Sequence, residues 1–80
     1  MDYPIKTSAQ LGPVLAGIRR SRKLTQAGIG SKVGLAQNYV SMLETTSSKA
    51  SVHQLFKLLS ALEVDLVIRD RRNQASKADW

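Results

Sequence analysis

The apolar positions in the first quarter of the chain repeat at the spacing of a helix. They fall at i, i+4 and i+7: Leu11, Leu15 and Ile18. This spacing predicts a first helix that ends near Ser21. The letters TSAQ at residues 7–10 form a capping-box pattern, so the helix could begin at Ser8. A later start is also open, because Pro13 would take its favoured first helical position if Gly12 were the cap.

Two shorter helices are predicted next. Thr25 can cap the first of them, and Gly34 suits the left-handed residue that ends it. The second runs from about residue 36 to residue 44. Together they present four apolar residues to the core: Ile29, Val33, Val40 and Leu43. Gly30 either allows close packing of the following helix or simply weakens the helix that contains it.

A fourth helix carries the largest apolar stripe of the chain. The letters SVHQ at residues 51–54 form a second capping-box pattern. The helix that follows is predicted to present one apolar face, made by Val52, Leu55, Phe56, Leu59 and Leu62.

At residues 64–70 the apolar residues recur at every second position, which indicates a strand. One face carries Val64, Leu66 and Ile68, and the other carries Asp65, Val67 and Arg69. A lone strand would leave its backbone groups unpaired. The simplest solution is the same strand from a second copy, antiparallel around a two-fold axis, so we expect Val64, Leu66, Val67 and Ile68 to form a dimer contact. An extension of the fourth helix, or weak pairing with residues 3–6, are the alternatives.

Composition narrows the class of protein. Eighty residues suggest one domain with a small core, and a chain without cysteine has no disulfide or thiolate metal site. With one histidine and no paired carboxylates or nucleophile–base set, we expect neither an enzyme nor a cofactor. The sequence shows no apolar run long enough to span a bilayer and no signal-peptide pattern, so we expect a cytoplasmic protein away from membranes. A net charge of +6 favours a polyanionic partner.

The order of these elements predicts a helix-turn-helix. A tight glycine-bearing turn joins two short helices, and the second of them is polar but uncharged before Glu44. Its polar residues are Gln37, Asn38, Tyr39 and Ser41. Such a helix is too polar for a core and too neutral for a simple solvated face.

Specific residues of this region resemble the Cro/C1 repressor-like (Xre) family. The matching positions are Leu15, Arg19, Leu24-Thr25-Gln26, Val33-Gly34-Leu35, Val40 and Glu44, within about residues 11–62. The predicted strand, the polar tail and the terminal Trp80 make the chain similar to the DNA-binding antitoxins of Hip-type toxin–antitoxin modules. That resemblance implies an all-α, lambda-repressor-like domain of four to five helices with a C-terminal strand that forms a two-stranded sheet in a homodimer.

We expect the chain to divide into four parts. These are an N-terminal arm (1–6), the helix-turn-helix domain (7–63), a dimerisation strand (64–70) and a disordered tail (71–80). Three positions depart from the family pattern: Ala36 offers no hydroxyl cap, Gly30 replaces the usual alanine, and Tyr39 is unusually bulky.

The resemblance also implies roles for individual residues. Arg19 is expected to pair with Glu44 and hold the third helix against the first. Gln37 and Asn38 would read base edges, since an amide can bond adenine N7 and N6 together. Ser41 would reach a base or a phosphate. Tyr39 would contact a thymine methyl or a phosphate, or instead pack on the domain itself.

Phosphate contacts are expected from both flanks of the third helix. The candidates are Thr25, Gln26, Lys32, Thr45, Thr46, Lys49, Ser51 and His53. The cationic run RRSRK at residues 19–23 would serve general attraction to DNA or contact an acidic partner.

These features favour a sequence-specific repressor that binds an inverted-repeat operator in double-stranded DNA as a homodimer. By resemblance it would also act as an antitoxin that neutralises a serine/threonine kinase toxin. Trp80 would dock on a partner, mark the tail for a protease, or have no role. The alternatives are a stand-alone Xre-type regulator and an interaction adaptor whose helix-turn-helix is vestigial.

Overall fold

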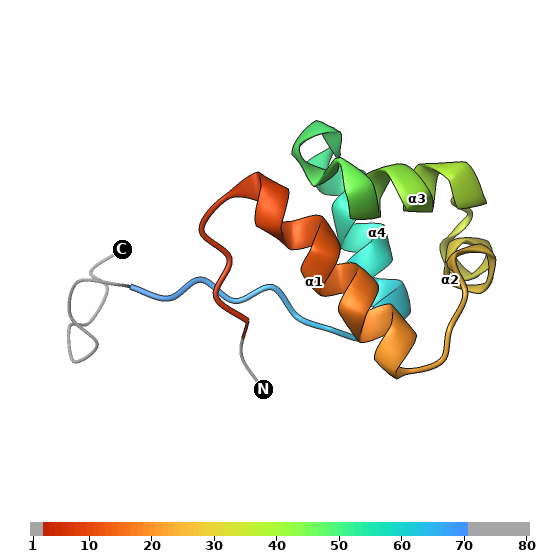
Figure 1. Cartoon of the computed structure of the whole chain (residues 1–80), viewed down its shortest axis with the longest axis horizontal. Helices are drawn as coiled ribbons and strands as arrows, with labels where there is room; N and C mark the ends of the chain where they lie inside the picture. The colour runs from red at the N-terminus through yellow and green to blue at the C-terminus, as the bar shows by residue number, and fades with distance from the viewer. Residues whose placement is uncertain (1–2, 71–80) are drawn as a thin grey trace.

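Four α-helices and one short 3₁₀ helix make up the described part of the molecule, residues 3–70 of the computed structural model (Figure 1). The helices are α1 Ser8–Ser21, α2 Gln26–Val33, α3 Gln37–Thr45, the 3₁₀ helix η1 Ser47–Lys49, and α4 Val52–Leu62. Figure 1 shows α2 nearly end-on at one side and α3 lying across the top, with α4 behind α1. The predicted tail at 71–80, Trp80 included, lies outside the described residues.

The first helix takes the earlier of its two predicted starts. It begins at Ser8 and contains Pro13 in its interior. The side-chain oxygen of Gln10 accepts hydrogen bonds from the backbone N–H groups of Thr7 (3.1 Å) and Lys6 (2.6 Å). These two bonds satisfy backbone N–H groups that precede the first turn. They explain why the helix begins at Ser8 and not at Pro13.

A serine from η1 supports α1 next to the proline. The Ser47 hydroxyl accepts a hydrogen bond from the Gly12 N–H (3.0 Å) and donates one to the Ser8 carbonyl. These two backbone groups are i and i−4 partners of the helix. Pro13 has no N–H to offer the next carbonyl, so the buried Ser47 side chain reinforces α1 where its own ladder is weakest.

The core lies where α1, α2, α3 and α4 meet. Its buried apolar residues are Leu15, Ala16, Ile29, Val40, Leu43, Leu58, Leu59, Ala61 and Leu62. The predicted inward positions of α2 and α3 are confirmed, with Ile29 and Val40 fully buried and Val33 half-buried.

The predicted apolar face of α4 is wrong in part. Val52 and Phe56 are exposed by 67% and 48%. Leu58, which the prediction left out, is fully buried beside Leu59 and Leu62. Apolar residues surround most of α4, so its sequence permits two overlapping stripes, and packing against α2 selects the one centred on Leu58 and Leu59.

Two glycines mark places where backbones touch. A Cβ atom on Gly12 would lie 2.4 Å from the carbonyl oxygen of Glu44, and one on Gly30 would lie 2.3 Å from that of Leu35. The close-packing interpretation of Gly30 is therefore confirmed, with the turn before α3 as its neighbour. Gly34 ends α2 with φ +74°, as predicted.

The chain after α4 is extended and carries no helix. Glu63 ends α4 in the left-handed conformation (φ 58°), so the alternative of a longer helix is wrong. Residues 64–70 then run away from the helices toward the side where the described N-terminal segment lies (Figure 1). Within residues 3–70 there is no strand or bridge, and no hydrogen bond reaches the backbone of residues 65–68. The predicted strand at 64–70 is therefore not formed within the described residues of the single chain.

An ion pair joins α1 to the end of α3. Arg19 donates from Nε to Glu44 Oε2 (2.7 Å) and from Nη2 to Oε1 (3.1 Å), a two-pronged geometry that guanidinium and carboxylate groups favour. Its Nη1 donates to the Leu24 carbonyl (2.7 Å), and the Gln26 amide adds a hydrogen bond to Glu44 Oε1 (3.0 Å). The two charged side chains are only 11% and 4% exposed. The pair expected from the sequence is present and links three helices.

Both members of this pair are held in their charged forms. Burial by itself raises the pKa of Glu44, but the hydrogen bonds from Arg19 and Gln26 and the nearby positive charges outweigh it, so the pKa lies below its ordinary value. The hydrogen bond to Glu44 raises the pKa of Arg19.

We predict that Gly12→Ala destabilises the fold by about 2 kcal/mol or more, because the new methyl group would overlap the backbone of α3. Gly17→Ala is the matched control: nothing lies within 4 Å of its Cβ position, and alanine should stabilise α1 by about 0.5–1 kcal/mol. Urea denaturation measures both. Equal effects at the two positions would contradict the close approach of α1 and α3.

Glu44→Gln is predicted to cost about 3 kcal/mol of unfolding free energy at pH 7, because it leaves the Arg19 charge buried without a counter-ion. Glu63→Gln, at an exposed position, should change it by less than about 0.5 kcal/mol. Chemical denaturation of both variants against the parent chain tests this difference.

The same pair sets the acid response. The pKa of Glu44 in the folded protein lies below its value of about 4.3 in the unfolded chain. The contribution of Glu44 to the unfolding free energy is therefore complete above about pH 4.3, and it is lost as the pH falls toward the folded pKa. The difference in unfolding free energy between the parent chain and Glu44→Gln should therefore shrink below about pH 4. A difference that stays constant down to pH 2–3 would contradict the assigned ion pair.

Candidate nucleic-acid interface

The polar side of α3 faces outward because its apolar side is fixed in the core. Val40 and Leu43 are fully buried, and they point toward the other helices. Gln37 and Asn38, in the first turn, are therefore exposed, and Ser41 follows on the same side with its side chain half-buried. The helix presents two amides and a hydroxyl within two turns.

The turn before α3 leaves the start of that helix accessible. Leu35 packs on the core and anchors the turn between Gly34 and Ala36. Ala36 is the N-cap residue and offers no side-chain hydrogen bond to the helix. The first N–H groups of α3 consequently have no side-chain cap and can face a solvent molecule or a ligand oxygen.

Tyr39 lies apart from this exposed group. Its ring is half-buried and packs against the core cluster, as does Met42. Of the interpretations given to Tyr39, the structure agrees with packing on the domain's own surface.

The start of α2 forms the first flank of α3. The Thr25 hydroxyl oxygen caps the helix by accepting from the Gly28 N–H (2.9 Å), which leaves the hydroxyl hydrogen for another acceptor. The Gln26 amide nitrogen has two hydrogens and directs one of them to Glu44 (3.0 Å). Glu44 thus holds Gln26 in place while the second hydrogen remains available to an outside acceptor. Lys32 is exposed at the far end of α2.

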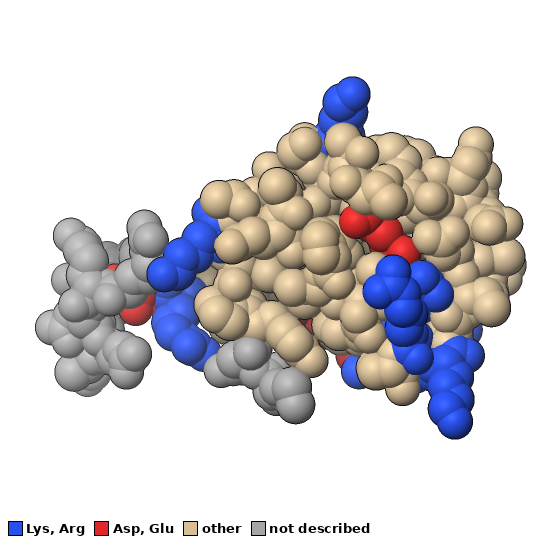
Figure 2. Space-filling view, in the orientation of Figure 1, with Lys and Arg blue, Asp and Glu red and all other residues tan. Residues whose placement is uncertain are grey.

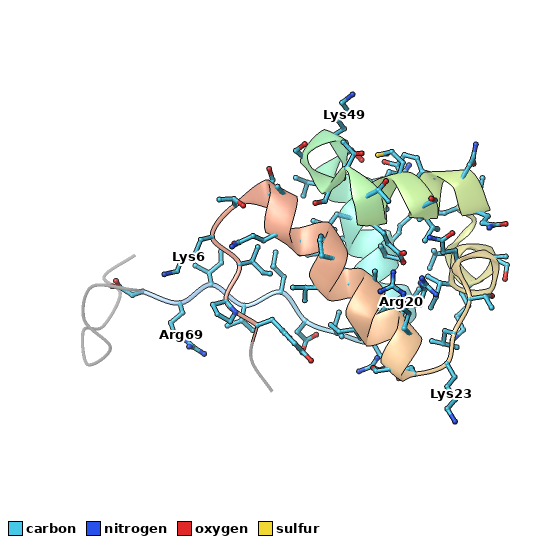
Figure 3. The ribbon with its side chains drawn as sticks, viewed as in Figure 1. Lys6, Arg20, Lys23, Lys49 and Arg69 are labelled. Atoms are coloured by element: carbon cyan, nitrogen blue, oxygen red, sulfur yellow. The ribbon has the colours of Figure 1, made fainter. Side chains whose placement is uncertain are left out.

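The second flank runs from the end of α3 to the start of α4. Lys49, Ser51 and His53 are exposed, and Figure 3 shows Lys49 pointing away from the body of the molecule. The Ser51 hydroxyl oxygen accepts from the Gln54 N–H (3.1 Å), which leaves its hydrogen for another acceptor. Thr46 is half-buried.

One predicted phosphate ligand, Thr45, is hydrogen-bonded within its own helix. The Thr45 hydroxyl donates its hydrogen to the Ser41 carbonyl (2.9 Å), as hydroxyls in a last helical turn commonly do. A phosphate oxygen needs a donor, so this side chain has none to give in the observed conformation.

Positive charge is distributed around α3 and not on it. Figure 2 shows tan surface over α3, with blue side chains at its upper edge, over the last part of α1 and toward the termini. Within the run at 19–23 the roles differ: Arg19 is in the ion pair and Arg22 donates to the Leu62 carbonyl at the end of α4. Arg20 and Lys23 are exposed (Figure 3). Sequence reasoning missed the bond from Arg22, because no local pattern indicates a contact 40 residues away.

Other kinds of site find no support in residues 3–70. No group of histidine, aspartate and glutamate side chains in that range could hold a metal ion. No helix within it is both long enough and apolar enough to cross a bilayer.

Comparison with known proteins agrees with this geometry. A family model described as Helix-turn-helix matches residues 15–74. Antitoxin HipB of Escherichia coli O6:H1 is 27% identical over 74 residues, which cover 92% of this chain and 79% of that protein. HipB in the HipB–O1–O2 complex superimposes with a TM-score of 0.82 at 25% identity, covering 86% of this chain and 100% of the other.

A second solved structure shows the same fold. A chain of the HipA–HipB–O2–O3 complex has a TM-score of 0.84 at 24% identity and covers 89% of this chain and 100% of its own length. Because the matched family model spans more than half of the 80 residues, the chain belongs to the helix-turn-helix family.

Proposed function

We propose that this protein is a sequence-specific DNA-binding repressor that also acts as the antitoxin of a toxin–antitoxin module. The observation that carries the proposal is the exposed, uncharged face of α3, with Gln37 and Asn38 at its start, between two flanks that carry donors and positive charge. Its likeness to HipB over 92% of its length supports the antitoxin half.

The amide face suits the edges of bases in a major groove. Each amide has a donor and an acceptor and can bond both N6 and N7 of one adenine. Gln37 and Asn38 are exposed and adjacent, and Ser41 lies one turn further on. A lysine or arginine in their place would attract any phosphate. A neutral face avoids that and leaves sequence reading to paired hydrogen bonds.

The two flanks would hold the DNA backbone. On one side Thr25 and Gln26 keep free hydrogens at the start of α2, where the helix dipole also favours an anion. On the other side Lys49, Ser51 and His53 surround the start of α4. Contacts to phosphates on both sides of the groove would fix the orientation of α3. Lys32 and Thr46 would contribute at the edges, whereas Thr45 is left out because its hydroxyl is engaged.

A second copy would complete both the fold and the DNA site. Residues 64–70 are extended, and Leu66, Val67 and Ile68 are 50%, 73% and 92% exposed. A two-stranded antiparallel sheet between two copies would pair this backbone and cover these side chains. The two α3 helices would then face two half-sites of an inverted repeat.

The partner toxin is inferred from the relatives. HipB occurs with HipA in the HipA–HipB–O2–O3 complex, and a chain of that complex has the fold of this protein. The resemblance to Hip-type modules supports a serine/threonine kinase toxin as the partner class. An antitoxin of this kind would act in the cytoplasm, where its operator and its toxin are.

We predict that Gln37→Ala weakens binding to the operator upstream of its own gene by about 1–3 kcal/mol and barely changes binding to random DNA, because it removes a base contact. Lys49→Ala is the contrasting variant: it should weaken both by a similar factor and reduce the salt dependence of binding. Gel-shift or anisotropy titrations at several salt concentrations measure both effects.

Equal affinity of the unmodified protein for operator and random DNA would exclude the repressor function. It would leave an interaction adaptor with a vestigial helix-turn-helix as the remaining interpretation.

The antitoxin half predicts a stable complex with the product of the neighbouring gene, a kinase. Co-expression with one tagged subunit, followed by an autophosphorylation assay, tests complex formation and neutralisation together. Specific operator binding without such a complex would leave a stand-alone regulator of the Xre type.

A further inference from the structure

We propose that Arg20 is a further ligand of the DNA backbone and that its guanidinium group shares one phosphate with the amide of Gln26. Lys23, an exposed cation from the same run of sequence, lies outside this contact. The proposal rests on the DNA binding of the proposed function and adds to it a residue from α1.

The structure gives the four cations of residues 19–23 different surroundings. Arg19 is bonded within the buried ion pair, and Arg22 donates to the last carbonyl of α4. Arg20 and Lys23 are exposed, and neither side chain makes a hydrogen bond within residues 3–70. The donors of these two cations are therefore available to a partner.

Arg20 lies beside the Glu44 carboxylate. It belongs to the last turn of α1, and Figure 3 shows it on the side of α1 that faces α2. Burial raises the pKa of Glu44, the hydrogen bonds from Arg19 and Gln26 lower it, and the charges of Arg19 and Arg20 lower it further. The effect of Arg20 places its guanidinium group near that carboxylate. Figure 2 agrees, since blue surface borders red surface where α1 and α3 meet.

The charges at this junction do not balance. The two oxygens of Glu44 already accept hydrogen bonds from Arg19 and from Gln26 (3.0 Å), so the carboxylate is bonded without Arg20. Two guanidinium groups and one carboxylate leave an excess of one positive charge. The ion pair is buried, whereas Arg20 is exposed, so the excess charge lies at the surface. That surface suits an anion.

The neighbouring donors on α2 favour a phosphate of DNA as this anion. The Gln26 amide is held by the same carboxylate and keeps one hydrogen for an outside acceptor, and the adjacent Thr25 hydroxyl keeps its own. A DNA phosphate carries one negative charge, and a guanidinium group can bind it with two parallel hydrogen bonds. A carboxylate of a partner protein could meet these donors too, but only a DNA phosphate also brings base edges to the amides of α3.

Lys23 differs from Arg20 in its position. It lies in the turn that follows α1 and has a left-handed backbone conformation (φ 58°). Figure 3 shows Lys23 pointing away from the molecule, at the opposite edge of the view from α3. Unlike Arg20, it does not act on the pKa of Glu44. Lys23 is thus a matched control: an exposed cation of the same run, away from the carboxylate that holds Gln26.

Binding titrations of the full chain at several salt concentrations test the assignment. Arg20→Gln should weaken binding to the operator upstream of its own gene and to random DNA by a similar factor, about tenfold. The slope of log K against log salt should become smaller by about 0.9, because one phosphate contact is lost. Lys23→Gln should leave the slope at its parent value. Arg20→Lys should keep the slope but weaken binding, since lysine keeps the charge and loses the two-pronged fit.

Operators with a single neutral methylphosphonate identify the phosphate itself. At one position of the half-site, this replacement should weaken binding of the parent chain and barely change binding of Arg20→Gln, because the two changes remove the same contact. Gln26→Ala should reduce the effect at the same position, since the two residues share the phosphate. Circular dichroism and urea denaturation check that each variant stays folded.

The contrary outcomes are distinguishable. Specific operator binding by the parent chain, with an unchanged salt slope in Arg20→Gln, would refute the contact and leave the repressor function intact. Equal loss of slope in Arg20→Gln and Lys23→Gln would show diffuse attraction and also refute it. Loss of the toxin complex in Arg20→Gln, with DNA binding unchanged, would assign the residue to an acidic protein surface instead. Equal affinity of the parent chain for operator and random DNA would refute the proposed function itself.

Discussion

The ion pair between Arg19 and Glu44 is the constraint on which the rest of the structure depends. Glu44 is the penultimate residue of α3 and is buried together with Val40 and Leu43. Because Arg19 approaches it from α1 with two hydrogen bonds, α3 cannot rotate about its axis without breaking a buried charge pair. The orientation of the amide face is therefore set at the opposite end of the same helix. A structural residue thus determines which polar side chains reach solvent.

The same end of α3 is also held by close contact with the backbone of α1. Gly12 lets α1 pack against the Glu44 carbonyl. Just after α3, the Ser47 hydroxyl bonds to the Gly12 N–H and the Ser8 carbonyl of α1. One contact fixes the distance between the two helices and the ion pair fixes their rotation. Gln26 extends the arrangement to α2, since its amide is oriented by Glu44. The start of α2 and the orientation of α3 thus depend on one carboxylate, so a change at Glu44 would disturb both.

Features with a local cause were predictable from the sequence. The left-handed Gly34 and the missing cap at Ala36 each follow from a few neighbouring residues, and the capping pattern gave one of the two starts left open for α1. The Arg19–Glu44 pair was reached only through family resemblance. Contacts between distant residues, such as Ser47 with Gly12, leave no local pattern. The buried face of α4 was predicted incompletely, since a helix that is apolar on most sides does not define its own orientation. The exposed Thr45 donates its hydroxyl hydrogen to the Ser41 carbonyl of its own helix, a contact that residue type alone does not predict.

Two features of the described chain face solvent: the polar side of α3 and the backbone of residues 65–68, which no hydrogen bond reaches. The proposed dimer links them. The Val64 N–H donates to the Leu59 carbonyl (3.0 Å), so the extended segment leaves α4 from a fixed point. A shift in strand register would then move the two helical bodies relative to each other, by about 3.3 Å per residue. Since DNA half-sites have fixed spacing, the register of two short strands would determine which operator spacing both α3 helices can read together.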